Sequence, residues 1–177
     1  GKGKGKDSAP FRLNHLARSE VAAVQTEAVR ALGALLKASR SQRVADALAA
    51  LDEGGEASCI DAVLTLLVSD HDALRLEASV VLVVAAGLAG SWRRFLGQDM
   101  RFEKLIEALK AAPRPEICGN VLGLLAHLLQ RIDAGLTPEQ RQRAATAAMS
   151  NPIVSTVPQV LQAAKAVETL AARQASI

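Results

Sequence analysis

Residues 60–109 read IDAVLTLLVSDHDALRLEASVVLVVAAGLAGSWRRFLGQDMRFEKLIEAL, and this stretch decides the expected fold. Two apolar segments with helical periodicity meet at the polar turn of residues 69–72. A polar and basic bend, residues 91–101, then leads to a third segment, which is amphipathic. Short helices joined by turns in this way are typical of one unit of a helical repeat, and weaker copies of the pattern lie on both sides.

The composition favours an all-α protein. The chain has 177 residues, which is enough for one domain with a sizeable core. Half of the residues are hydrophobic but only 2% are aromatic, so Ala and Leu supply most of the apolar volume. Both are strong helix formers, whereas a β-sandwich usually carries more aromatic and β-branched residues.

The positive charge is concentrated at one end. Residues 1–18 hold five basic residues and one acidic residue, a net charge of +4, so the remainder carries −1 of the total of +3. We interpret residues 1–18 as a flexible basic N-terminal segment (a linker, a tail or a cloning remnant) and residues 19–177 as a single helical repeat domain. Because the body has no excess of positive charge, nucleic acid is not the expected partner.

The cysteines and the hydropathy predict a location. Cys59 and Cys118 are too few for a disulfide framework and neither has a CxxC partner, which favours a reduced intracellular compartment. The cytoplasm is the default, with the nucleus left open. The uncharged run Ala78–Trp92 is shorter than the roughly 18 residues of a spanning helix. The chain starts without Met or a signal-peptide pattern, so we expect a fragment of a longer protein with no membrane span.

The apolar spacing predicts eight helices. Ser19, Asp72 and Thr137 are the expected N-caps, with Gln140 completing a capping box at Thr137. The run of residues 80–84 alone is compatible with a buried strand, but its long Ala- and Leu-rich context favours a helix. The predicted helices cover residues 19–38, 41–51, 58 or 59–68, 73–89, 102–111, 115–131, 137–149 and 158–173.

The long helices share an internal pattern. Each carries a small residue followed four positions later by a larger apolar one. A small residue lets two helices cross closely, and the larger one fills the layer behind it. The small residues are 50, 40 and 45 positions apart, a spacing typical of helical-repeat arrays. The pairs are Ala28 with Leu32, Ala78 with Leu82, Cys118 with Leu122, and Ala163 with Val167.

This pattern resembles the armadillo repeat family. The best match is residues 91–126, where a short helix with Trp92, Phe95 and Leu96 precedes LIEALK, a turn and CGNVLGLLAHLL. HEAT repeats are the near alternative, because both families stack helices in the same way. The resemblance implies a right-handed α-solenoid of about four armadillo-like repeats, in which each repeat buries its apolar face against its neighbours.

The resemblance also implies a partner-binding groove, which in the family is lined by the third helix of each repeat and binds peptides or partner domains. Peptide-binding members carry ladders of Asn and Trp there, and neither ladder is present in this sequence. Ala, Val and Leu lack the amide donor and acceptor of Asn, so nuclear-localisation-signal recognition is not expected. The matching positions, which we take as candidate partner-binding residues, are Arg30, Ala34, Val80, Val84, Asn120, Leu124, Lys165 and Thr169.

The apolar positions among them allow two interpretations. Val80, Val84 and Leu124 occupy positions that would be exposed to solvent in an open groove. The groove therefore either binds a hydrophobic helix or loop, or is covered by a neighbouring element. Asn120 would orient a partner backbone beside them. We favour an apolar binding groove.

A local basic patch also has two interpretations. Arg93, Arg94, Arg101 and Lys104 lie close in sequence to Trp92, Phe95 and Phe102. In the first interpretation, the basic residues bind an acidic partner or RNA. In the second, the aromatic rings enter the core and the charges are solvated. Helical spacing alone explains the pattern, so we favour the second interpretation.

The sequence carries no constellation typical of an enzyme. The Asp70-His71-Asp72 turn lacks a visible fourth metal ligand, and we interpret it as a turn with a cap. Cys118 and His127 are nine residues apart on one predicted helix, roughly 13 Å along its axis, so Cys118 is expected to be a small core residue. We expect no enzyme activity, no cofactor and no metal.

The predicted function is that of a non-catalytic protein–protein interaction module. It would be an armadillo-like scaffold or adaptor, for example in cytoskeletal or trafficking regulation, that binds a partner helix or peptide on its concave surface. One alternative is an armadillo domain of the co-chaperone or exchange-factor type. The other is nucleic-acid binding through the Lys-rich tail and the Arg93–Lys104 patch, which a steep salt dependence would reveal.

Overall fold

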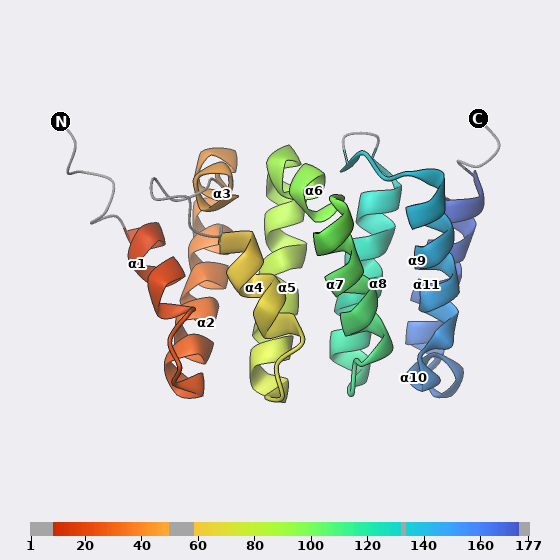
Figure 1. Cartoon of the computed structure of the whole chain (residues 1–177), viewed down its shortest axis with the longest axis horizontal. Helices are drawn as coiled ribbons and strands as arrows, with labels where there is room; N and C mark the ends of the chain where they lie inside the picture. The colour runs from red at the N-terminus through yellow and green to blue at the C-terminus, as the bar shows by residue number, and fades with distance from the viewer. Residues whose placement is uncertain (1–8, 50–58, 132–133, 174–177) are drawn as a thin grey trace. The chain divides into compact units, whose positions relative to one another are not determined.

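The computed structural model describes residues 9–49, 59–131 and 134–173. All regular secondary structure in these ranges is helical, which confirms the predicted all-α class (Figure 1). The run of residues 80–84 lies within a helix and not a strand. The chain divides into two compact units, Gly1–Trp92 and Arg93–Ile177. Residues 1–8 of the predicted basic segment lie outside the described residues.

The first unit is built on two long helices that lie side by side. Figure 1 shows α2 and α5 running in the same direction, with shorter helices packed against them. α1 packs against α2 and α3, and α4 packs against α5. The helices are α1 (Ala9–Leu16), α2 (Ala22–Ser39), α3 (Gln42–Ala49), α4 (Cys59–Leu67) and α5 (Asp72–Leu88), followed by the start of α6 (Gly90–Leu96).

Small residues bring α2 and α5 close together. A methyl group added at Gly33 of α2 would lie 3.3 Å from Cγ2 of Val81 on α5, so the two helices touch at this level. The predicted pairs of a small and a larger apolar residue in both helices are at most 3% exposed, as expected for close-packed helices.

Trp92 fastens α6 to α3 within the first unit. Its ring is fully buried, and its Nε1–H donates a hydrogen bond to the backbone oxygen of Ala45 at 2.7 Å. A buried indole normally finds such an acceptor, because an unpaired N–H in the core is costly.

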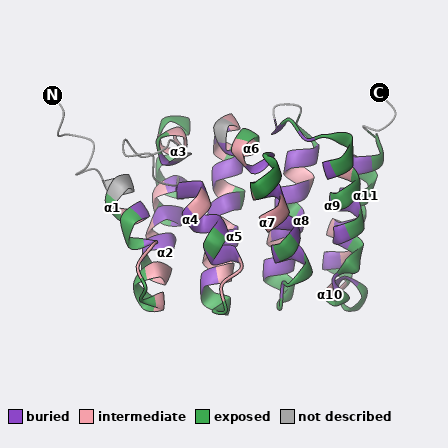
Figure 2. Ribbon diagram, in the orientation of Figure 1, coloured by how far each residue is buried: buried purple, intermediate pink, exposed green. Residues whose placement is uncertain are grey.

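The second unit repeats the arrangement. α11 packs against both α8 and α9, and α7 packs against α9 and α8. In Figure 2, α8 is mostly purple, or buried, whereas α9 is green over much of its visible side. Its helices, four of which begin with a proline suited to the first turn, are α7 (Asp99–Lys110), α8 (Pro115–Leu129), α9 (Pro138–Ser150), α10 (Pro152–Thr156) and α11 (Pro158–Arg173).

The predicted N-caps have mixed outcomes. The capping box at α9 is confirmed: Gln140 N donates to Thr137 Oγ1 at 3.2 Å, and Thr137 N donates to Gln140 Oε1 at 2.8 Å. The prediction for Ser19 is wrong, because α2 starts later, at Ala22, and the Ser19 hydroxyl only accepts from Val21 N. The prediction for Asp72 is also wrong, because Asp72 is already the first residue of α5.

Two predicted boundaries are wrong for a common reason. Residues 9–16 form α1, whereas the sequence predicted a flexible segment to residue 18. The bend predicted at residues 91–101 is largely helical: α6 spans its first half, where the armadillo match had implied a short helix, and α7 begins at Asp99, before the predicted start at residue 102. Helices of about two turns are unstable alone and form only when they pack against neighbours, which the local sequence does not reveal.

Among the helices of the described ranges, none combines the length and the apolar character that crossing a bilayer requires.

Candidate functional site

The outward sides of α2 and α5 form the surface that carries four of the predicted partner-binding residues. We call this surface the α2–α5 face. Its members recur at helical spacing and are all exposed or half-buried. They are Glu27, Arg30, Ala34 and Lys37 of α2 with Glu77, Val80 and Val84 of α5.

Arg30 joins the two helices across this face. Its Nε lies 3.0 Å from Glu77 Oε1 and its Nη1 lies 2.6 Å from Glu27 Oε1. The hydrogen bond to Glu77 is the main cause that raises the pKa of the Arg30 guanidinium, and the charge of Glu27 adds to it. The three side chains fix the spacing of α2 and α5 at the surface, and together they carry one net negative charge.

Beyond this ion cluster the face is apolar. Val80 and Val84 are half-buried, Ala34 is exposed, and the neighbouring Val83 is 37% exposed. A solvent-facing helix side normally carries polar residues at these positions. Valines on the outward side of α5 are therefore a feature that packing within this unit does not explain.

The predicted partner-binding residues of the second unit are arranged differently. Asn120 is half-buried, and Lys165 and Thr169 are exposed, with Thr169 Oγ1 donating to the Lys165 carbonyl at 2.8 Å. Leu124, however, is only 2% exposed. Its assignment as a partner-binding residue is wrong, because it belongs to the buried stripe of α8. Of the two interpretations left open for this position, coverage by neighbouring elements holds.

The fourth repeat keeps the predicted register, although its small residue is only partly covered. Ala163 is half-buried, whereas the next residue, Ala164, and the predicted larger residue, Val167, are fully buried. With Ala171, α11 therefore buries the positions one, four and eight residues after Ala163. α2 buries the same three positions after Ala28.

The basic patch is partly occupied by internal contacts. The Arg101 guanidinium lies over the Phe95 ring, 5.1 Å from its centre, and its Nη1 donates to Gln98 Oε1 at 2.8 Å. Phe102 is fully buried. Arg93 and Lys104 are half-buried and Arg94 is exposed. The burial of Phe102 agrees with the second interpretation of the sequence, whereas the half-buried Phe95, which carries the Arg101 cation, does not.

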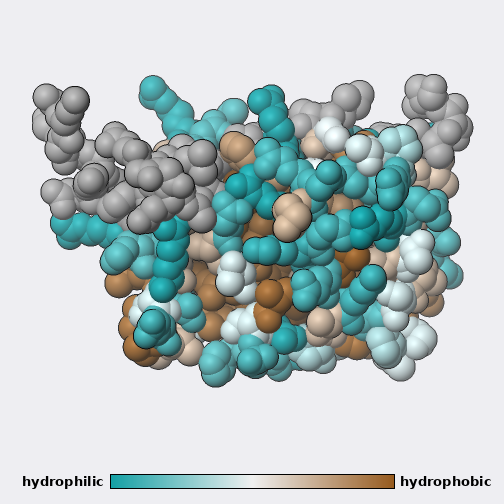
Figure 3. Space-filling model, in the orientation of Figure 1, coloured by the Kyte–Doolittle hydropathy of each residue, from teal (hydrophilic) through white to brown (hydrophobic). Residues whose placement is uncertain are grey.

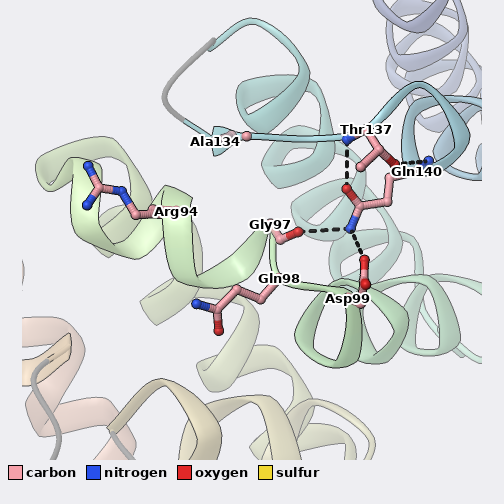
Figure 4. Close-up of a pocket in the computed structure, with 8 residues that line it drawn as sticks. Arg94, Gly97, Gln98, Asp99, Ala134, Thr137 and Gln140 are labelled. Carbon is pink, nitrogen blue, oxygen red and sulfur yellow. Dashed lines mark hydrogen bonds between the residues drawn. The ribbon is translucent and has the colours of Figure 1, made fainter.

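An open hollow of about 430 Å³ lies between the start of α7 and the start of α9 (Figure 4). The amide nitrogen of Gln140, a buried residue, donates to the Gly97 carbonyl at 2.8 Å and to Asp99 Oδ1 at 3.0 Å. Figure 4 shows the side chains of Arg94 and Gln98 pointing away from this cluster. The groups that converge on the hollow already bond one another, so the cluster fastens α9 to the α6–α7 turn.

Asn151 is a second buried polar fastener that the sequence analysis missed. Its Nδ2 donates to the carbonyls of Leu109, at 2.7 Å, and Ala112, at 3.2 Å, while Oδ1 accepts from Ile153 N at 2.9 Å. It thereby closes the end of α7 and caps α10. Asn followed by Pro is an N-cap signal that could have revealed this role from the sequence.

The cysteine thiols of the described residues lie in the core, and the side chains that could bind a metal do not form a cluster. Cys118 is fully buried, and burial raises the pKa of its thiol to about 11, so at neutral pH it stays protonated and unreactive. Cys59 is also buried. Within the described part of the chain, no three His, Cys, Asp or Glu side chains gather at a metal-binding distance.

The visible sides of α7 and α9 are mainly hydrophilic (Figure 3). An Arg143–Glu103 ion pair links the two helices there. Such a surface needs no partner, so the apolar α2–α5 face remains the stronger candidate.

Comparison with known proteins adds information on the fold. No protein-family model matches the sequence, and no curated protein does. The crystal structure of an engineered protein resembles this chain with a TM-score of 0.66 at 22% sequence identity. The likeness covers 93% of this chain and 62% of that one, so the chain spans less than two thirds of its neighbour. At this identity the likeness concerns the fold alone.

Proposed function

We propose that this chain is a non-catalytic protein-interaction module built as a right-handed α-solenoid of about four armadillo-like repeats. Two features support the architecture. In each unit, two long helices run in the same direction and pack side by side, α2 with α5 and α8 with α11 (Figure 1). Small buried residues occur in both units at repeat-like spacing, as at Ala78 and Cys118.

The observation that carries the binding function is the apolar stretch of the α2–α5 face. Val80, Val83 and Val84 leave hydrocarbon in water at successive turns of α5, next to the exposed Ala34. Covering such a stretch with a partner would stabilise the complex by about 25 cal/mol for each Å² of apolar surface removed from water. We therefore place the partner, a peptide or helix of another protein, on this face.

A reduced intracellular setting fits a chain whose only two cysteines, Cys59 and Cys118, are buried as small apolar core residues. In that setting a scaffold or adaptor role fits a surface that holds a partner and performs no chemistry.

Selection from a displayed library of random peptides tests the binding face. We expect peptides enriched on the wild-type chain to lose at least about tenfold in affinity for the double variant Val80→Glu/Val84→Glu, because buried carboxylates would oppose the apolar contact. Both positions are only half-buried, so the variant should stay folded, which circular dichroism checks.

The matched control is Met149→Glu, a substitution at a 43% exposed residue of α9. It adds one carboxylate, as each substitution of the double variant does, to an apolar surface residue that does not belong to the face, and it should leave peptide affinity unchanged. Equal losses in the control and the double variant, or no loss in either, would refute binding at the α2–α5 face.

A further inference from the structure

The α2–α5 face has opposite charges at its two ends. At the end where α2 and α5 begin, the cluster of Glu27, Arg30 and Glu77 carries one net negative charge. At the other end, the exposed Lys37 lies in the last turn of α2. The apolar stretch lies between the two.

The distance between these ends corresponds to a short helix. Glu27 and Lys37 are ten residues apart on one side of α2, which is about 15 Å along the helix axis. A ligand that meets both charges must therefore place complementary charges about ten residues apart if it is helical, or four to five residues apart if it is extended.

The two helix dipoles of the face distinguish these ligands. α2 and α5 run in the same direction (Figure 1), so their positive ends both lie at the acidic end of the face and their negative ends at the basic end. A helix that lies antiparallel to them has favourable dipole interactions with both. The same orientation places its first turn beside Lys37 and its last turn beside Glu27.

We propose that the occupant of the α2–α5 face is an amphipathic helix of a partner protein, about three turns long, that lies antiparallel to α2 and α5. It carries acidic residues in its first turn, an apolar stripe that covers Val80 and Val84, and basic residues in its last turn. This charge order also stabilises the free partner helix, because acidic residues favour a helix N-terminus and basic residues a C-terminus. The inference rests on the proposed function of the face.

Two synthetic peptides of 14 residues with capped ends test this orientation. The first has Glu at positions 2 and 3, Leu at positions 4, 7, 8 and 11, and Lys at positions 12 and 13. The second has the same composition with the Glu and Lys positions exchanged. Fluorescence anisotropy at low salt measures binding of each to the wild-type chain and to the double variant Glu27→Lys/Lys37→Glu, which keeps the net charge.

We expect the wild-type chain to bind the first peptide about tenfold more tightly than the second, because each exposed ion pair changes affinity only a few-fold. The double variant should reverse the preference. This reversal separates the effect of the face from the greater intrinsic helicity of the first peptide, which is the same for both proteins. The preference should also shrink as salt is raised, because exposed charges are screened.

Three outcomes would overturn the inference: equal binding of the two peptides, the same preference with both proteins, or no binding of either. The first two, with affinity still lost in Val80→Glu/Val84→Glu, would leave the proposed function standing while removing the antiparallel helix. The proposed function would also stand without the antiparallel helix if neither synthetic peptide binds but peptides from the random library bind in a way that depends on Val84. If no selected peptide depends on Val80 and Val84, the proposed function itself fails.

Discussion

Gly97 occupies a position that no other residue type fits. A Cβ atom added there would lie 2.1 Å from the Ala134 carbonyl oxygen, far inside van der Waals contact, and the obstructing atom belongs to the backbone. Gly123, in the middle of α8, is the opposite case, because nothing lies within 4 Å of an added Cβ atom. The two glycines therefore have different roles that their sequence context does not reveal.

We expect Gly97→Ala to lower the free energy of unfolding by about 2 kcal/mol or more, since the turn must shift away from Ala134. Gly123→Ala should instead raise it by about 0.5–1 kcal/mol, because alanine restricts the unfolded chain and favours the helix. Urea denaturation of both variants measures the difference. Effects of the same sign would contradict the close approach at Gly97.

At the level of helices, two buried polar side chains each cap one helix and bond to a neighbouring element. Asn151 serves two helices at once, because its amide nitrogen closes α7 and its amide oxygen caps α10. Gln140 likewise caps α9 and holds the α6–α7 turn through the Gly97 carbonyl. Both side chains are buried and fully engaged, so removing either would leave buried backbone groups without partners.

Asn151→Ala should reduce the free energy of unfolding by about 2–4 kcal/mol, because it removes a cap and the donor to the buried Ala112 carbonyl. The Leu109 carbonyl still accepts from Ala112 N. The amide proton of Ile153 should exchange faster as well, since Asn151 Oδ1 is its acceptor. Urea denaturation and hydrogen exchange measure the two effects. Gln162→Ala, at an exposed position of α11, is the control and should change stability by less than about 0.5 kcal/mol.

For the molecule as a whole, charge is distributed unevenly. The net charge of +3 arises from the first 18 residues, and at least one arginine of the basic patch is held on an aromatic ring. Any attraction to nucleic acid should therefore depend mainly on the N-terminal lysines and be strongly sensitive to salt.

Replacing Lys2, Lys4 and Lys6 by Gln tests this expectation. If the wild-type chain binds duplex DNA at low salt, the variant should bind more weakly, and the slope of log K against log salt should fall by up to about 2.7, or 0.9 for each lysine that contacts phosphate. Anisotropy titrations at several salt concentrations measure it. A slope that is unchanged in this variant but reduced by Arg94→Gln would assign the binding to the basic patch instead.

The sequence by itself determined the features that depend on local spacing. The all-α class, the starts of α8, α9 and α11, the capping box at Thr137, and the burial of Ala28, Ala78 and Cys118 all follow from residue types at fixed intervals. Of the candidate site, the sequence identified Arg30, Ala34, Val80 and Val84 as one set, and the structure places these four on one face.

Only the tertiary structure decided the features that depend on which neighbour approaches. Leu124 is buried and Val84 is half-buried although both are apolar residues at equivalent positions of the predicted pattern. The tertiary structure likewise decided the formation of α1 and the double roles of Gln140 and Asn151. Periodicity states which side of a helix is apolar, but the packing of the other helices determines how much of that side remains in contact with water.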